Sequence, residues 1–180
     1  MSSIAVKMEV LNGWSPTQNR GRGGEGTMKI LDYLKEEWVI PVLQGTDKRS
    51  ILKELSSVLV KPCQVASQEE LLQVLYDREK LESTGIGEGI AIPHGRLKKL
   101  KNFFISFGRS VKGVDFDSID HKPTHLFFLV MAPENSAVNN LKLLGRIVTL
   151  LKDASFKKRL MEAQFQKDLF QIISEEDDKY

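Results

Sequence analysis

The chain has 180 residues, enough for one domain with a tail, and its 41% hydrophobic and 28% charged residues are ordinary for a globular protein. Lys and Arg number 26 against 24 Asp and Glu, and a net charge of +2 argues against nucleic-acid binding or a basic membrane anchor. Its apolar runs are far shorter than the roughly 20 residues of a membrane-spanning helix. No secretory leader is visible and Cys63 is the single cysteine, so we expect a cytoplasmic protein without an internal disulfide and without membrane insertion.

Residues 1–27 differ in composition from the rest of the chain. Five of the 13 glycines lie between Gly13 and Gly26, in a stretch with almost no apolar residues. Such a segment cannot bury enough surface to offset its ordering entropy, so we expect residues 1–27 to be a disordered extension of a single domain over 28–180. Two origins of the extension stay open: a genuine flexible tail, or a start codon upstream of the true one at Met28.

From Met28 onward the apolar periodicity predicts helices and strands in mixed order. Taken in chain order, they are a short strand Val39–Leu43, helices Arg49–Val60 and 67–81, strands Ile90–Ile92, Phe103–Phe107 and Leu126–Met131, and helices Val138–Leu151, Phe156–Ala163 and Asp168–Ile173. The almost continuously apolar strand Leu126–Met131 is typical of a central strand covered on both faces. The pattern therefore predicts a mixed α/β domain, with helices on both sides of a mixed sheet.

Side-chain spacing within the helices predicts their caps and buried faces. Ser67 with Glu70 forms a capping-box pattern, and Ser155 is a candidate cap for the following helix. The second helix should bury Leu71, Val74, Leu75 and Leu81, and the helix Val138–Leu151 should bury Leu141, Leu144, Val148 and Leu151. The acidic end, Glu175–Asp178, is expected to fray.

The stretch from Arg78 to Arg96 has the strongest chemical signal. Three alternating glycines precede a short apolar run and then Pro93-His94-Gly95. Glycine lets the backbone bend and approach closely, while proline fixes the backbone just before the histidine. The pattern favours an imidazole presented at the end of a strand with little steric cover, as a nucleophilic histidine requires. The alternative is an ordinary turn histidine, which position alone favours.

Arg78 starts from the buried face of the helix before this stretch, so its guanidinium needs an acceptor. A transient acceptor such as a phosphoryl group would serve. A permanent one, such as a carboxylate or the carbonyls at the helix end, would serve equally well.

The segment Ser83-Thr84-Gly85-Ile86-Gly87-Glu88-Gly89-Ile90-Ala91-Ile92-Pro93-His94-Gly95, preceded by Arg78-Glu79-Lys80, resembles the active-site motif of enzyme IIA domains of the fructose/mannitol type. These domains belong to the bacterial phosphoenolpyruvate-dependent phosphotransferase system, and the likeness is greatest to their stand-alone nitrogen-regulatory (PtsN-type) branch. Phe116–Asp120, Pro123 and Ala132-Pro133 also lie where the family has similar residues. The resemblance covers about residues 28–174.

The resemblance implies a role for each residue of the motif. His94 would accept a phosphoryl group at Nε2 from the phosphohistidine of HPr, with Nδ1–H held by an acceptor. Arg78 would balance the phosphoryl charge, and Thr84, Gly85, Gly87 and Gly89 would shape the loop and offer backbone N–H donors. Gly95 leaves the space beside the imidazole open. No cofactor and no metal are implied.

One position departs from the family. Enzyme IIA domains of this type usually have a second histidine on the helix that follows the Ala-Pro segment, and the corresponding residue here is Asn140. An asparagine can donate a neutral hydrogen bond to a phosphoryl oxygen, but it cannot become cationic or relay a proton. Phosphotransfer through His94 would then be slower, or the phosphohistidine less stabilised.

Other polar residues have plainer interpretations. His121 and His125 flank Pro123 at a turn, with no third ligand to complete a metal site. The run Lys98–Lys101 is typical of a solvated loop. Cys63 has no paired base in sequence and is expected to be structural.

The resemblance, together with the departure at Asn140, leaves three functions open. The first is a phosphoryl carrier that accepts from HPr and regulates a partner such as a kinase or a transporter. The second is a sugar-specific enzyme IIA that passes the group to an enzyme IIB on a separate chain. The third is a non-catalytic interaction module that has lost phosphotransfer because of Asn140.

Overall fold

We describe residues 27–180 from a computed structural model; the predicted disordered tail, apart from Thr27, lies outside the described residues. The elements in chain order are η1 (Ile30–Asp32), β1 (Leu34–Ile40), α2 (Lys48–Ser57), α3 (Gln68–Leu81), β2 (Gly85–Gly87), β3 (Ile90–Ala91), β4 (His94–Leu97), β5 (Phe104–Val114), β6 (Thr124–Pro133), α4 (Ala137–Leu151), α5 (Ala154–Glu162) and α6 (Gln166–Asp177). No helix among residues 27–180 is both long enough and apolar enough to cross a bilayer.

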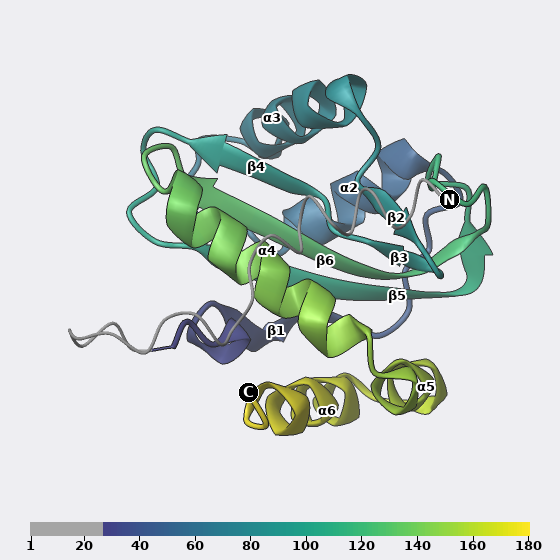
Figure 1. Cartoon of the computed structure of the whole chain (residues 1–180). Helices are drawn as coiled ribbons and strands as arrows, with labels where there is room; N and C mark the ends of the chain where they lie inside the picture. Colours follow the sequence, from purple (N-terminus) through teal and green to yellow (C-terminus); the bar gives the residue numbers. More distant parts are fainter. Residues whose placement is uncertain (1–26) are drawn as a thin grey trace, which may run out of the picture.

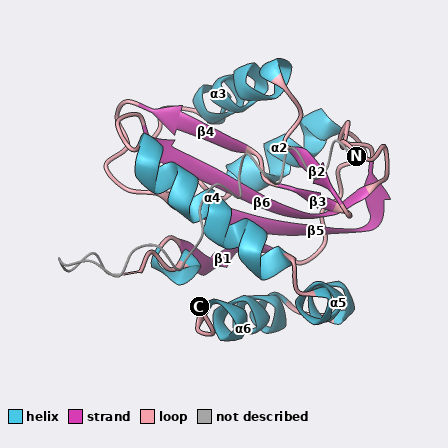
Figure 2. Ribbon diagram, in the orientation of Figure 1, coloured by secondary structure: helices cyan, strands magenta, loops and turns pink. Residues whose placement is uncertain are grey.

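The strands form one mixed sheet in the order β1-β5-β6-β3-β2, with β4 also paired to β6 (Figure 1, Figure 2). β1 is parallel to β5, β5 is antiparallel to β6, and β3 and β4 are both parallel to β6. β6 therefore has β5 along one edge, and β3 and then β4 along the other. This arrangement confirms the predicted mixed sheet.

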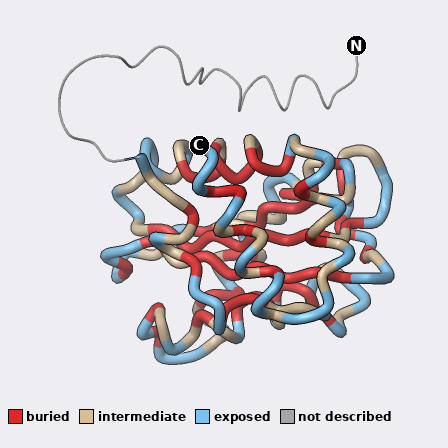
Figure 3. The backbone as a smooth tube through the Cα atoms, turned by 90° about the horizontal axis from the view of Figure 1, so that it is seen from below, coloured by how far each residue is buried: buried red, intermediate tan, exposed pale blue. Residues whose placement is uncertain are grey.

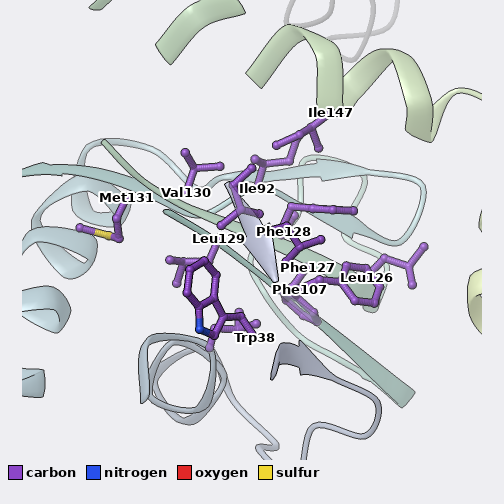
Figure 4. Close-up of a cluster of buried hydrophobic side chains, with 14 of the residues drawn as sticks. Trp38, Ile92, Phe107, Leu126, Phe127, Phe128, Leu129, Val130, Met131 and Ile147 are labelled. Atoms are coloured by element: carbon purple, nitrogen blue, oxygen red, sulfur yellow. The ribbon is translucent and has the colours of Figure 1, made fainter. Parts of the chain in front are cut away.

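Strand β6 is the centre of the core. Every residue from Leu126 to Ala132 is buried, as expected for a strand covered on both faces. Helix α4 crosses the front face of the sheet in Figure 1, while α2 lies behind it. Ile147 of α4 and Trp38 of β1 lie on opposite sides of the strands (Figure 4), and the buried segments gather between the layers (Figure 3).

Two strands differ most from their predicted bounds. β1 spans Leu34–Ile40 instead of Val39–Leu43, because the charged residues 35–37 lie exposed on a strand at the edge of the sheet. β5 continues past Phe107 to Val114, because Gly108 and Arg109 pair with β6. Both segments contain charged or small residues, so apolar runs alone do not indicate that they are strands.

The helices occur where they were predicted, but their caps and outermost residues differ. Ser67 is the N-cap of α3 without a side-chain capping bond, and Asp153, not Ser155, caps α5. The predicted burial of Leu81 and Leu141 was wrong, because their exposed fractions are 81% and 52%. Both lie near helix ends, Leu81 as the last residue of α3 and Leu141 in the early part of α4, where the core no longer covers them.

The prediction of a frayed acidic C-terminus was also wrong. Helix α6 continues to Asp177, whose buried carboxylate accepts from Arg146 Nε at 2.6 Å and from the backbone N–H of Leu31 at 3.1 Å. Arg146 also donates to the Asp177 carbonyl at 2.6 Å. The end of the chain is thereby fastened to α4 and to η1.

Candidate functional site: an imidazole beside a guanidinium

His94 is the first residue of β4, where it pairs with Val130 of the central strand. Its ring is partly buried, and Nδ1 lies 2.9 Å from the carbonyl oxygen of Ile92. Sequence reasoning expected the histidine just after a strand. The structure instead makes it the start of a second, short strand, so the backbone of His94 is fixed by the sheet.

Arg78 reaches the same ring from helix α3. Its Nε donates to His94 Nε2 at 3.1 Å, and its Nη1 donates to the carbonyl oxygen of Glu82 at 2.9 Å. One of the permanent acceptors considered from the sequence, a helix-end carbonyl, is therefore present. The guanidinium nevertheless lies directly at the nitrogen that would form a bond to phosphorus.

The two contacts of the His94 ring define its tautomer. A carbonyl oxygen only accepts, so the bond to Ile92 requires hydrogen on Nδ1. Arg78 Nε–H only donates, so Nε2 must offer its lone pair. The geometry is that of a neutral imidazole whose Nε2 carries a lone pair and no hydrogen.

Electrostatics favour the same neutral form. Burial lowers the pKa of His94 below its ordinary 6.5, and the positive charges of Arg78 and Arg96 lower it further. The Ile92 carbonyl and the negative charge of Glu79 act in the opposite direction. At neutral pH the ring keeps the lone pair that a phosphoryl acceptor requires.

Gly95 brings α3 close to β4. A Cβ at this position would lie 2.5 Å from Val74 Cγ1, so any side chain would push the helix away from the strand. Arg78 is one turn beyond Val74 on the same helix. The glycine therefore places the arginine within reach of the histidine.

Gly85, Gly87 and Gly89 build the hairpin of β2 and β3. Gly87 and Gly89 have positive φ values of 93° and 76°, which side-chain-bearing residues rarely adopt. A Cβ at Gly85 would lie 2.9 Å from the Cα of Ser118. The glycines thus allow a tight turn and a close approach to the segment around Ser118.

The backbone N–H groups of this loop have partners within the fold. Gly85 N donates to Ser83 Oγ at 3.1 Å, and Gly87 N donates to Ser118 Oγ at 3.0 Å. Thr84 N donates to both carboxylate oxygens of Glu79, at 3.3 Å and 3.2 Å. In this state these groups hold the loop in place.

Sequence reasoning missed Glu79 as a member of the site. Its side chain is only 6% exposed, and it binds both Thr84 and the ammonium of Lys48, which lies 3.2 Å away. The sequence feature that could have indicated Glu79 is its position next to Arg78, within the Arg78-Glu79-Lys80 part of the motif. A charged residue on a helix gives no local sign that it is buried, because its ion-pair partner Lys48 lies on another helix.

Asn140 lies in the first turn of α4, after the end of β6 that pairs with β4. Its backbone N–H donates to Ser136 at 2.7 Å, and its side-chain Oδ1 is buried without a hydrogen-bond partner. An unpaired buried amide oxygen is uncommon, because it has lost its water without compensation. Contact between Asn140 and the phosphoryl group stays a prediction.

The remaining sequence candidates lie in other settings. His125 Nδ1 is 2.9 Å from the Ser110 carbonyl, and His121 is an exposed turn residue with a positive φ of 55°. Within residues 27–180, no group of three or more His, Cys, Asp or Glu side chains is arranged to hold a metal ion. Burial raises the pKa of the Cys63 thiol to about 12, so it stays protonated and unreactive at neutral pH.

Comparison with known families agrees with the fold. The sequence profile described as "Phosphoenolpyruvate-dependent sugar phosphotransferase system, EIIA 2" matches residues 32–176. The architecture and this match together define a phosphotransferase-system component of the enzyme IIA class. The chain belongs to the EIIA type 2 family, which confirms the resemblance noted in its sequence.

Curated relatives fall into two groups. The nitrogen regulatory protein of Bradyrhizobium diazoefficiens is 36% identical over 149 residues, which are 82% of this chain and 95% of that protein. The fructose-specific EIIABC component of Bacillus subtilis is 35% identical over 150 residues, 83% of this chain but 24% of that longer protein.

Solved structures share the fold. The nitrogen regulatory protein IIA-Ntr of Neisseria meningitidis superimposes with a TM-score of 0.74 at 29% identity, covering 79% of this chain and 97% of the other. The mannitol IIA of Escherichia coli gives a TM-score of 0.65 at 22% identity, covering 77% and 97% of the two chains. At this low sequence identity, the similarity to the mannitol IIA shows a shared fold alone.

Proposed function

We propose that this protein is a phosphoryl carrier with a regulatory role, which accepts a phosphoryl group from phospho-HPr at Nε2 of His94. The observation that carries the proposal is the state of the ring: Nδ1–H bound to the Ile92 carbonyl, and Nε2 facing the guanidinium of Arg78. Family membership and the nitrogen regulatory relatives support the general role.

The proposed step is a transfer between two imidazoles. The lone pair of His94 Nε2 attacks phosphorus, the new N–P bond forms, and the N–P bond of the donor histidine breaks with its electron pair returning to the donor ring. The donor ring leaves as a neutral imidazole when its other nitrogen carries a proton. His94 keeps hydrogen on Nδ1 during the attack and becomes a phosphoimidazolium, which can then release that proton to water, so no base is needed to activate Nε2. Arg78 exchanges its bond to Nε2 for bonds to the phosphoryl oxygens, where its charge stabilises the transferring group. Asn140 would donate from its amide to the same group.

The test is phosphorylation by phosphoenolpyruvate, enzyme I and an HPr from the same cell, measured by intact mass. The wild type should gain one acid-labile phosphate and His94→Ala none. His121→Asn is the matched control, because it removes an exposed histidine at a position whose positive φ asparagine tolerates. It should be phosphorylated like the wild type.

No phosphate on the wild type would overturn the carrier function and favour the interaction module. That module would bind its partner equally well as wild type and as His94→Ala. The ratio of the transfer rates of Asn140→His and of the wild type then measures how much the absence of the second histidine slows phosphotransfer.

A sugar-specific role is the second candidate, because the fructose-specific EIIABC component is as similar as the nitrogen regulatory relatives. The distinguishing measurement is onward transfer from the phosphorylated protein to a sugar-specific enzyme IIB. Rapid transfer would favour sugar uptake, and absence of transfer would favour the regulatory role.

A further inference from the structure

The buried carboxylate of Glu79 has no part in the transfer step described above. A carboxylate that is removed from water needs bonded partners, because an uncompensated buried charge is costly. Glu79 has three donors from two residues: Lys48 Nζ, and the backbone N–H and hydroxyl of Thr84. The charge of the Glu79 carboxylate is therefore compensated within the fold. Glu79 directly follows Arg78 in the sequence.

From Thr84 a chain of hydrogen bonds leads to the imidazole. The carbonyl of Thr84 accepts from the backbone N–H of Ile92 at 3.0 Å. The carbonyl of Ile92 in turn lies 2.9 Å from Nδ1 of His94. The peptide of Ile92 is therefore held on its N–H side by Thr84 and holds the histidine on its carbonyl side.

The Glu79 end of this series of hydrogen bonds is held by residues from several elements. Lys48 is the first residue of α2, and besides Glu79 it contacts Asp117 at 2.7 Å and lies 4.9 Å above the ring of Phe116. Glu79 comes from α3, and Thr84 from the loop that enters β2. Movement of Thr84 relative to α3 would require breaking the bonds to Glu79.

We propose that Glu79 is a positioning residue for the phosphoryl acceptor: by fixing Thr84, and through it the Ile92 peptide, it keeps the His94 ring in the orientation and tautomer that leave Nε2 available. The inference rests on the proposed function of His94. Glu79 acts through other groups, whereas Arg78 contacts the reacting nitrogen itself.

The test uses Glu79→Gln in the full-length protein. Glutamine keeps the shape, but one of its two terminal atoms becomes a donor that faces Lys48 or Thr84. Glu70→Gln is the matched control, since Glu70 is on the same helix and is also paired with a lysine, Lys99, at 2.5 Å, but near the surface. Both variants change one negative charge on α3.

The first measurement is the nitrogen-15 spectrum of the His94 ring in the unphosphorylated protein, which separates protonated from unprotonated ring nitrogens. We expect a single Nδ1–H tautomer in the wild type and in Glu70→Gln, and a mixture of tautomers in Glu79→Gln. This measurement requires no phosphoryl donor, so it tests Glu79 even where the carrier function fails.

The second measurement is the rate of phosphorylation as a function of phospho-HPr concentration. For Glu79→Gln the maximal rate should fall about 10- to 100-fold, because a small displacement of a reacting group has a cost of this size. The donor concentration at half-maximal rate should stay unchanged, because the carboxylate is buried and cannot touch the donor. Glu70→Gln should match the wild type.

An unchanged tautomer together with a maximal rate within twofold of wild type would overturn the inference. If Glu79→Gln fails to fold, Lys48→Met takes its place, because it loosens Glu79 and leaves the bonds to Thr84. A mixed tautomer and a lower maximal rate in that variant would support the inference, and wild-type behaviour in both measurements would overturn it.

Discussion

At the scale of single residues, the acceptor is defined by what surrounds one ring. His94 has a carbonyl at Nδ1 and a guanidinium at Nε2: the first contact requires hydrogen on Nδ1, the second requires a lone pair on Nε2, and together they select the neutral Nδ1–H tautomer. The carbonyl belongs to Ile92, two residues earlier, whereas the guanidinium belongs to Arg78 on helix α3. The arrangement at Nε2 therefore depends on a helix and a strand being packed together.

The lowered pKa of His94 predicts how phosphorylation depends on pH. Because burial disfavours the charged ring, the acceptor should stay neutral, and transfer should stay fast, as the pH falls below 6.5. An NMR titration of the His94 ring should give a midpoint below 6.5, and the transfer rate should decline with that midpoint. A midpoint at or above 6.5 would contradict the electrostatic account.

The same shift has a defined sign for stability. Unfolded His94 gains a proton near pH 6.5, while the folded ring resists protonation, so the unfolded state binds more protons between 6.5 and the folded pKa. The contribution of His94 to the free energy of unfolding therefore falls as the pH is lowered through this window. Above pH 6.5 this contribution does not change with pH, because the ring is neutral in both states.

Replacing Arg78 with lysine tests whether the geometry of the guanidinium matters beyond its positive charge. Arg78→Lys keeps the positive charge but loses the Nε donor to His94 and the fixed fork that also binds the Glu82 carbonyl. We expect phosphorylation to slow about 10- to 100-fold, because a donor preorganised for the transferring group is lost. Rapid-quench measurement of the transfer would check this, and a rate equal to that of wild type would show that charge alone suffices.

At the scale of elements, the contact between α3 and β4 assembles the site. Gly95 allows this contact, because its missing side chain gives room to Val74. From the sequence, Gly95 was interpreted only as space beside the imidazole. Its role in helix packing could not be predicted, since it depends on a residue of another element.

Gly95→Ala should lower the free energy of unfolding by about 1–3 kcal/mol, as overpacking a tight contact does. Gly145→Ala is the opposite control: no atom lies within 4 Å of the added Cβ, and in helix α4 alanine should stabilise by about 0.5–1 kcal/mol. Urea unfolding of both variants measures whether each substitution lowers or raises the free energy of unfolding. Adding Val74→Ala to Gly95→Ala should recover part of the loss, and strict additivity would contradict the clash.

At the scale of the whole molecule, the C-terminus closes the domain. Asp177 connects α6 with Arg146 of α4 and with Leu31 of η1, which joins the beginning and the end of the described chain. Both charged side chains are buried, with 9% and 0% of their surfaces exposed. Breaking such a pair leaves an uncompensated buried charge.

We therefore expect Asp177→Ala to lower the free energy of unfolding by about 3–5 kcal/mol. The neighbouring Asp178→Ala is the control, because Asp178 pairs with Lys29 at the surface, where both side chains are well exposed. Its effect should be much smaller. Equal losses in the two variants, measured by urea or thermal unfolding, would contradict a specific role of the buried pair.

The sequence by itself determined the fold class, the central strand and the family to which the chain belongs. Apolar runs and their spacing are local properties, and a long motif around one histidine is read along the chain. What only the tertiary structure decided is where polar residues find their partners. The strand that contains the charged residues 35–37 pairs with β5, the buried Asp177 binds Leu31, and the carboxylate of Glu79 binds Lys48, so each depends on residues distant in sequence. A charged side chain looks solvated until the packing of other elements supplies its counter-ion, and that packing cannot be read from local periodicity.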